Sequence, residues 1–129
     1  MTMKRISTFA LLLGLVLVAG AAAGVTVTVF TTLFTPPLVP EGQNVLDCYL
    51  VNVSDQERQA TIEVLNQDGT PLNSVGVTLN PGAEAVATVP ASASPRYCKF
   101  QIEGTRLHFR ASALVRQPGA GSISALPAE

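Results

Sequence analysis

Apolar and polar residues alternate along most of the chain after residue 24, which is the pattern of strands buried on one side. These segments are rich in Val, Ile, Leu, Thr and aromatic residues, and no window of similar length carries a helical apolar stripe. A first strand is expected at Val25–Phe34, which Pro36 and Pro37 must end because proline cannot donate to a strand ladder. The other predicted strands are Gln43–Val53, Gln59–Leu65, Ser74–Leu79, Ala83–Val89, Arg96–Glu103 and Arg106–Val115.

Turn residues separate these segments. Ser54-Asp55, Asp68-Gly69 and Asn80-Pro81-Gly82-Ala83 lie between predicted strands, and the last places Pro and Gly where a type II turn requires them. Short strands with turns between them are typical of an antiparallel β-sandwich. The sequence therefore predicts an all-β domain of Ig-like architecture with about seven strands.

The last two segments can be paired residue by residue. Gly104-Thr105 suits a two-residue type II′ turn, which would make these segments a hairpin. In that register Phe100 faces Phe109 and Cys98 faces Ala111, all on an apolar side. The predicted hairpin thus has one face for the core and one for solvent.

The solvent side of this hairpin is basic. Lys99 would lie opposite Arg110, and like charges in that position are destabilising unless an anion lies between them. An acidic glycan, a phosphate head group or an acidic protein strand would supply one; the alternative is a solvated face with its charges splayed into water. The candidate anion- or partner-binding residues are Lys99, Arg106, His108 and Arg110.

The two cysteines both point inward. Leu46, Cys48 and Leu50 share one face of their strand while Asp47 lies on the other, and Cys98 points to the apolar side of the hairpin. Two inward thiols with no third cysteine predict a disulfide if the chain is exported, as its N-terminus indicates below. A redox-active pair is the alternative, but the C-x-x-C spacing that lowers a thiol pKa is missing.

The N-terminus has the anatomy of a secretory signal. Lys4 and Arg5 precede an unbroken apolar run, Phe9–Ala19, and Ala21–Ala23 offers small residues for cleavage after Ala21 or Ala23. An uncleaved membrane anchor is the competing interpretation, because apolar residues continue as far as Val29. We expect a signal peptide at 1–23 and a secreted or periplasmic protein, with a membrane attachment only if the leader is retained.

The length of the remaining chain predicts one domain at 24–116. We expect a flexible tail at 117–129, because small residues, Gly and Pro prevail there. Removal of Lys4 and Arg5 leaves six basic residues against nine acidic ones, a net charge of −3. That balance argues against nucleic acid as a partner.

The sequence offers little chemistry. His108 is the single histidine, too few for a zinc, copper or iron site of the usual kinds, and no nucleophile elbow, phosphate loop or calcium loop is present. We predict no enzymatic activity, metal or cofactor. Asn52-Val53-Ser54 fits the N-glycosylation pattern, which has meaning only in a host that uses it.

Several strings together resemble a group of small exported bacterial proteins without an assigned function. The strings are Leu46–Ser54, Asp68-Gly69, Leu79–Gly82, Arg96–Phe100 and Phe109–Ser112, and the similarity covers about Gln43 to Leu114. The resemblance implies a β-sandwich with one bridge and no activity to transfer. The chain lacks the tryptophan of an antibody domain, so Ig-like describes architecture only.

We therefore expect an exported, non-catalytic domain with a binding or structural role, whose partner is an extracellular protein or glycan. Sheet edges or the basic face would meet that partner. A carbohydrate-binding module is the alternative, with a thin aromatic platform of Tyr49 and Tyr97, both predicted outward. A small hydrolase is third, since it would need His108 in a cleft beside a nucleophile.

Export and bridging are tested together by the intact mass of protein recovered from an exporting host, with and without reduction before thiol alkylation. We expect a soluble species lacking residues up to Ala21 or Ala23, alkylated only after reduction. A full-length membrane species with two freely alkylated thiols would contradict both expectations.

Overall fold

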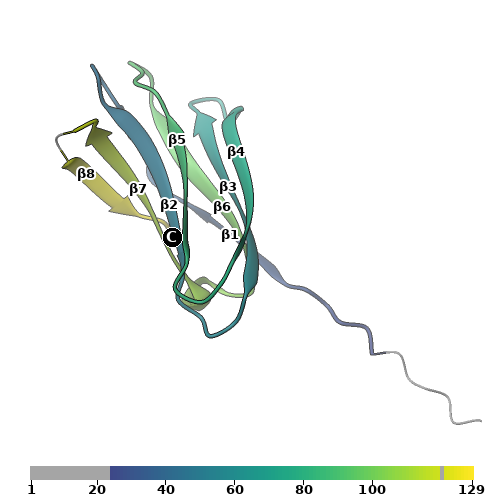
Figure 1. The fold of residues 1–129 in the computed structure, drawn as a ribbon. Helices are drawn as coiled ribbons and strands as arrows, with labels where there is room; N and C mark the ends of the chain where they lie inside the picture. The colour runs from purple at the N-terminus through teal and green to yellow at the C-terminus, as the bar shows by residue number, and fades with distance from the viewer. Residues whose placement is uncertain (1–23, 120) are drawn as a thin grey trace, which may run out of the picture.

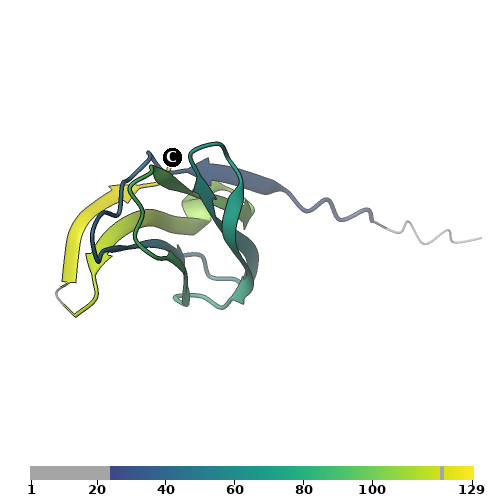
Figure 2. The same ribbon diagram turned by 90° about the horizontal axis from the view of Figure 1, so that it is seen from above.

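The computed structural model describes residues 24–119 and 121–129, so the predicted signal peptide 1–23 lies outside the described residues. Two antiparallel sheets of four strands each pack face to face in an all-β, β-sandwich-like fold (Figures 1 and 2). Sheet A has the order β1-β6-β3-β4 and sheet B the order β5-β2-β7-β8. The elements are β1 Phe30–Phe34, β2 Val45–Asn52, β3 Arg58–Asn66, β4 Pro71–Leu79, β5 Glu84–Val89, β6 Arg96–Glu103, the 3-10 helix η1 Arg106–His108, β7 Phe109–Gln117 and β8 Gly121–Pro127.

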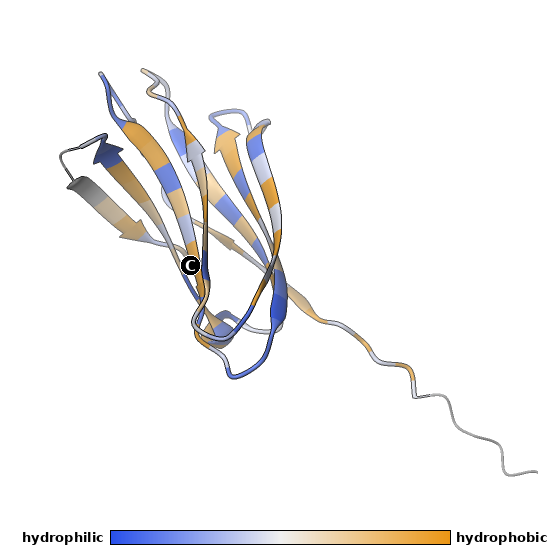
Figure 3. Cartoon of the chain, in the orientation of Figure 1, coloured by the Kyte–Doolittle hydropathy of each residue, from blue (hydrophilic) through white to orange (hydrophobic). Residues whose placement is uncertain are grey.

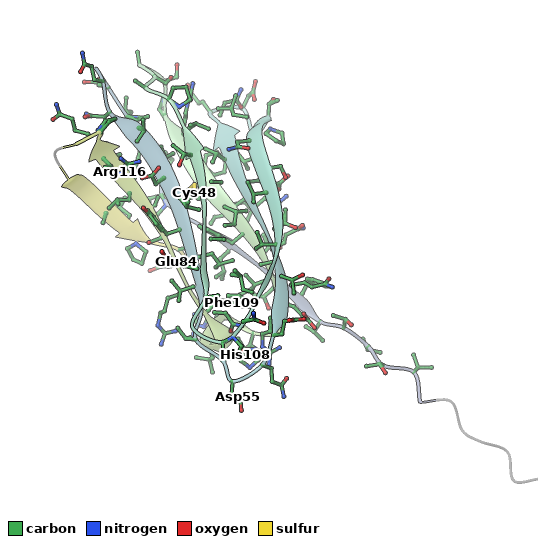
Figure 4. All side chains as sticks on the ribbon, in the orientation of Figure 1. Cys48, Asp55, Glu84, His108, Phe109 and Arg116 are labelled. Atoms are coloured by element: carbon green, nitrogen blue, oxygen red, sulfur yellow. A yellow bond between two sulfur atoms is a disulfide. The ribbon has the colours of Figure 1, made fainter. Side chains whose placement is uncertain are left out.

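The core lies between the sheets and is built from alternate residues of the strands. Phe100 and Ile62 of sheet A and Leu46 and Leu50 of sheet B are fully buried. Phe109, at the start of β7, is 2% exposed and closes one end of the core (Figure 4). Burial of these side chains is the main source of stability in a domain of this size.

A disulfide joins the two sheets through the middle of the core. Cys48 on β2 and Cys98 on β6 are fully buried, with their Cα atoms 5.7 Å apart. Ala87 and Ala113 lie opposite Cys48 on its two neighbouring strands, and these small side chains leave room for the bridge. The predicted pairing is confirmed, and a disulfide fits an oxidising, exported compartment.

The predicted hairpin between the last two segments is wrong. β6 belongs to sheet A and β7 to sheet B, so the two strands do not pair with each other. The 3-10 helix η1 connects them. Phe100 lies opposite Leu33 and Ile62, not Phe109. Both arrangements bury Phe100 and Phe109, so alternation alone cannot distinguish a pair of strands in one sheet from a pair in facing sheets. In the predicted hairpin Leu107 would share the inward face of Phe109, whereas it is 73% exposed on η1.

The turn at Asn80–Ala83 agrees with the sequence. Ala83 N–H donates to the Asn80 carbonyl at 2.9 Å, and Gly82 has a φ of 77°. A positive φ at this position favours glycine, as a type II turn requires. This turn carries the chain from β4 in sheet A to β5 in sheet B.

The predicted flexible tail at 117–129 is also wrong, because residues Gly121–Pro127 form β8 beside β7. Ala128 N–H then donates to the Ala111 carbonyl at 3.0 Å, and Glu129 exchanges two backbone hydrogen bonds with Phe34. Small residues have low strand propensity, which is why the sequence predicted no strand here. In the fold this segment pairs its backbone with the edge of β7, and a local propensity does not include such a distant partner. The domain therefore extends to residue 129.

The first strand is shorter than predicted. β1 covers Phe30–Phe34, while residues 24–29 leave the body of the domain as a projecting segment (Figures 1 and 2). After β1 the two prolines interrupt the ladder, which resumes as an isolated bridge between Leu38 and Arg96. Within residues 24–119 and 121–129, no helix is long and apolar enough to cross a membrane.

The disulfide should dominate stability. A variant with Cys48→Ala and Cys98→Ala loses a cross-link over a sequence separation of 50, which is worth about 4 kcal/mol in the chain-entropy model. We expect the free energy of unfolding, measured in urea, to fall by about that amount. Reductant should shift the midpoint of the wild type and leave the variant unchanged. Equal midpoints for the oxidised wild type and the variant would disprove this role.

Candidate functional site

The predicted basic face does not form. Lys99 lies on the outer face of sheet A, where its Nζ is 2.8 Å from Oε2 of Glu63 on the neighbouring strand. Arg110 lies on the outer face of sheet B, opposite Val51. The two cations that were expected to face each other therefore belong to different sheets, and Lys99 is neutralised by an acid from sequence far away.

His108 lies at one end of the sandwich, the end opposite Arg116 (Figure 4). Its Nδ1 accepts a hydrogen bond from the Thr105 N–H at 3.1 Å, so this nitrogen holds the start of η1. In the described part of the chain, no hydrogen bond joins His108 to a serine or a carboxylate, and no group of three His, Cys, Asp or Glu side chains could hold a metal ion. His108 thus has a structural role in the described geometry.

Two of the four predicted basic residues do share a groove. Arg106 and Arg110 both line a cavity of about 500 Å³ beside η1, which we call the η1 groove. Its apolar lining comes from Leu33 and Leu107, among others. Neither arginine forms an ion pair with a described carboxylate. Glu129 lines the groove as well, so it combines an apolar lining with charged residues of both signs.

An ion pair between buried Asp47 and partly exposed Arg116 crosses the outer face of sheet B. Asp47 is fully buried although it points away from the core, because Arg116 and Thr88 of the flanking strands cover it. Its carboxylate accepts from Arg116 Nε at 2.7 Å and from the Thr88 hydroxyl at 2.6 Å. The hydrogen bond between Arg116 and Asp47, together with the negative charge of Asp47, raises the pKa of the Arg116 guanidinium above its ordinary value. The network ties three strands together and leaves no free carboxylate for a ligand.

The outer face of sheet A has a shallow hollow of about 390 Å³. Gly76 of β4 lies opposite Thr61 of β3, and a Cβ atom added at Gly76 would meet nothing within 4 Å. The side chains around this gap carry hydroxyl, amide or aromatic groups: Thr61, Thr78, Gln59 and Phe30. We call it the Gly76 hollow. None of its lining residues is charged, so it suits a neutral, hydrogen-bonding ligand.

Aromatic residues gather at the β1 side of the same face. Phe30 and Phe34 are 54% and 47% exposed, and the ring of Tyr97 lies 6.3 Å from that of Phe34. Tyr49 lies on the other sheet, so the two tyrosines do not form the single platform that the sequence suggested. Sequence reasoning missed Phe30 and Gly76; a glycine inside a predicted strand was the available signal.

Asn52, the acceptor residue of the N-glycosylation pattern, is inaccessible in the folded domain. Asn52 is fully buried, and its Nδ2 donates to the carbonyls of Gln56 and Leu79 at 2.7 and 2.8 Å. These bonds fix the loop after β2 and occupy the nitrogen that a glycan would need.

Comparisons with known proteins give the fold alone. No protein-family model matches the chain, and no curated protein matches it. A crystal structure of Thermotoga maritima 1070 is similar at 13% sequence identity with a TM-score of 0.53, covering 76% of this chain and 91% of that one. At that identity the likeness supports a shared all-β architecture and transfers no site.

Removing one partner of the Asp47–Arg116 pair should lower the stability of the fold, whereas replacing both partners by apolar residues should restore it. Arg116→Met leaves the Asp47 carboxylate, 1% exposed, with Thr88 as its remaining side-chain partner, and should lower the urea midpoint of unfolding because a buried charge loses its counter-charge. Adding Asp47→Leu should restore most of the loss, because no buried charge then remains. Urea midpoints of the two variants test this; a double variant as unstable as the single one would show that the pair itself stabilises the fold.

Proposed function

We propose that this chain is an exported, non-catalytic domain that binds another macromolecule at the cell exterior or in the periplasm. The observation that carries the proposal is the Gly76 hollow with the exposed aromatic residues beside it. It is an open, uncharged recess on a rigid sheet, and sites on strands hold their geometry better than sites on loops.

The export part of the proposal is supported by the disulfide. A fully buried bridge between Cys48 and Cys98 persists in oxidising compartments and is rare where thiols are kept reduced. The leader-like sequence before residue 24 points the same way.

Binding without catalysis is supported by where the polar groups lie. Lys99 and Glu63 satisfy each other on sheet A, and Asp47 and Arg116 satisfy each other on sheet B. Such paired groups shape a surface but supply no free acid or base for proton transfer. The small hydrolase has no favouring observation among the described residues.

A carbohydrate-binding module is the second candidate, and the Gly76 hollow favours it. Sugars are bound by hydrogen bonds from amides and hydroxyls together with contact against aromatic faces. Gln59, Thr61 and Thr78 supply the first kind of group and Phe30 the second. The platform is small, which suits one or two sugar units rather than a long chain.

We further propose that the architecture is Ig-like. The bridge runs between β2 and β6, β2 pairs with β5 and β6 with β3, as strands B, E, F and C do in antibody domains. The terminal strands depart from that plan, since β1 lies beside β6 and β7 lies beside β2.

Filling the hollow tests the function. Gly76→Leu places a side chain in open space without strain, so the fold should be retained while binding at the hollow is lost. Ser74→Leu is the matched control, because Ser74 lies two residues along on the same exposed face of β4 and does not line the hollow. The measurement is binding of the three proteins to an array of bacterial and plant glycans and to cell-envelope preparations.

The outcomes separate the two candidates. Glycan binding that Gly76→Leu abolishes and Ser74→Leu retains would support the carbohydrate-binding module. Envelope binding with the same dependence and no glycan signal would support a protein partner. Binding that both variants retain, or no binding by the wild type, would overturn the proposal for this face.

A further inference from the structure

The segment Gly24–Val29 projects from the domain as an apolar tail. Val25, Val27 and Val29 are 87%, 76% and 59% exposed, and threonines alternate with them. Figure 3 shows no strongly hydrophilic residue along this tail. Three exposed β-branched side chains in an alternating, uncharged segment are typical of a strand without its partner.

Within residues 24–119 and 121–129, the edge of β1 away from β6 has a backbone partner only at Phe34. Phe34 exchanges backbone hydrogen bonds with Glu129 at 3.0 and 3.1 Å, on the side away from β6, while Thr35 N–H donates to Cys98 on the β6 side. Alternate residues of a strand direct their backbone groups to the same side. The N–H and C=O groups of Phe30 and Thr32 therefore point to the edge that Glu129 covers only at Phe34.

The η1 groove lies beside this edge. Leu33 of β1 is part of its lining, together with Leu107, Phe109 and Ala111. Leu107 is 73% exposed, whereas Leu33 and Phe109 are almost fully buried. An apolar recess next to unpaired strand backbone is the arrangement that accepts an added strand, since backbone bonds give affinity and pockets receive alternate side chains.

The tail has the alternation that this acceptor requires. Val29 C=O accepts from Gly104 N–H at 2.7 Å, so the alternation of β1 extends back to Val29. Continued along the tail, it places Val25, Val27 and Val29 on the face of Leu33, which lines the groove. The threonines fall on the opposite face.

We propose that the Gly24–Val29 tail pairs antiparallel with this edge of β1 in a second copy of this chain and inserts its valines into that copy's η1 groove. The exchange is reciprocal: each copy donates one tail and accepts the other, and a two-fold axis closes the assembly. Sheet A of one copy then continues into sheet A of the other.

A second copy fits better than the chain's own tail. The tail leads away from β1 in the same direction and has no glycine or proline between Val25 and Phe30 to turn it back. Identical segments also meet without repulsion, because residues 24–40 contain no charged side chain. The charged residues that line the groove, Arg106, Arg110 and Glu129, include both signs, so an uncharged tail meets no net like-charge repulsion there.

Two neighbouring lysine substitutions test the exchange on processed protein from an exporting host. Val27→Lys puts a charge against the apolar lining of the groove, whereas Thr28→Lys puts the same charge on the opposite face of the tail. Both positions are exposed in a projecting segment, so each monomer should fold normally. Leu107→Glu changes the acceptor at an exposed position.

The measurement is molar mass by light scattering across a range of protein concentration. We expect a dimer for the wild type and Thr28→Lys, and dimer dissociation constants raised roughly tenfold or more for Val27→Lys and Leu107→Glu. A monomeric wild type, equal dimers of all four proteins, or equal loss with Thr28→Lys would overturn the exchange. So would recovery of the chain only in membranes with its leader retained, because the tail would then be the stem beside the bilayer.

Discussion

The Cys48–Cys98 bridge is the constraint on which the rest of the structure depends. It joins β2 and β6, and each of these strands has a neighbour on both sides within its own sheet. The bridge therefore fixes the faces of both sheets that must pack together, and every other strand takes its inward face from that register. Ala87 and Ala113 next to Cys48 are small for the same reason, since the sheets must approach closely at this point.

Once the inward faces are set, the outward faces follow, and each carries one internally satisfied ion pair. Lys99 with Glu63 crosses two strands of sheet A, and Asp47 with Arg116 does so in sheet B. Lys99 and Asp47, which the sequence leaves without partners, are thus used to hold neighbouring strands together. Two surfaces remain for recognition: the uncharged Gly76 hollow on one face, and the η1 groove at the β1 edge, where apolar and charged residues lie together.

The edge strands β4, β5 and β1 differ in how far their outer backbone groups are covered. The β4 and β5 edges lie together, where the Asn73 side chain donates to the Thr88 carbonyl at 3.0 Å. The β1 edge is covered at Phe34 by Glu129, and no other described residue pairs with the backbone of Phe30 and Thr32 on that side. An open, uncharged edge is normally avoided in a monomeric protein, which is the reason for proposing a partner strand at this one.

The sequence by itself determined the strands β2 to β7 apart from their exact ends, the inward direction of both cysteines and the disulfide, because alternation and turn chemistry are local and the two thiols had no other partner. It also anticipated the turn at Gly82, where a positive φ favours glycine. Only the tertiary structure decided which strands are neighbours. Phe100 and Phe109 are buried whether β6 and β7 share a sheet or face each other, so alternation could not choose, and the basic face built on the wrong choice disappeared. In the same way β8 depends on backbone bonds to β7, and the Gly76 hollow on Phe30 and Thr61 from distant strands. Strand pairing is a long-range choice, and local pattern carries no information about it.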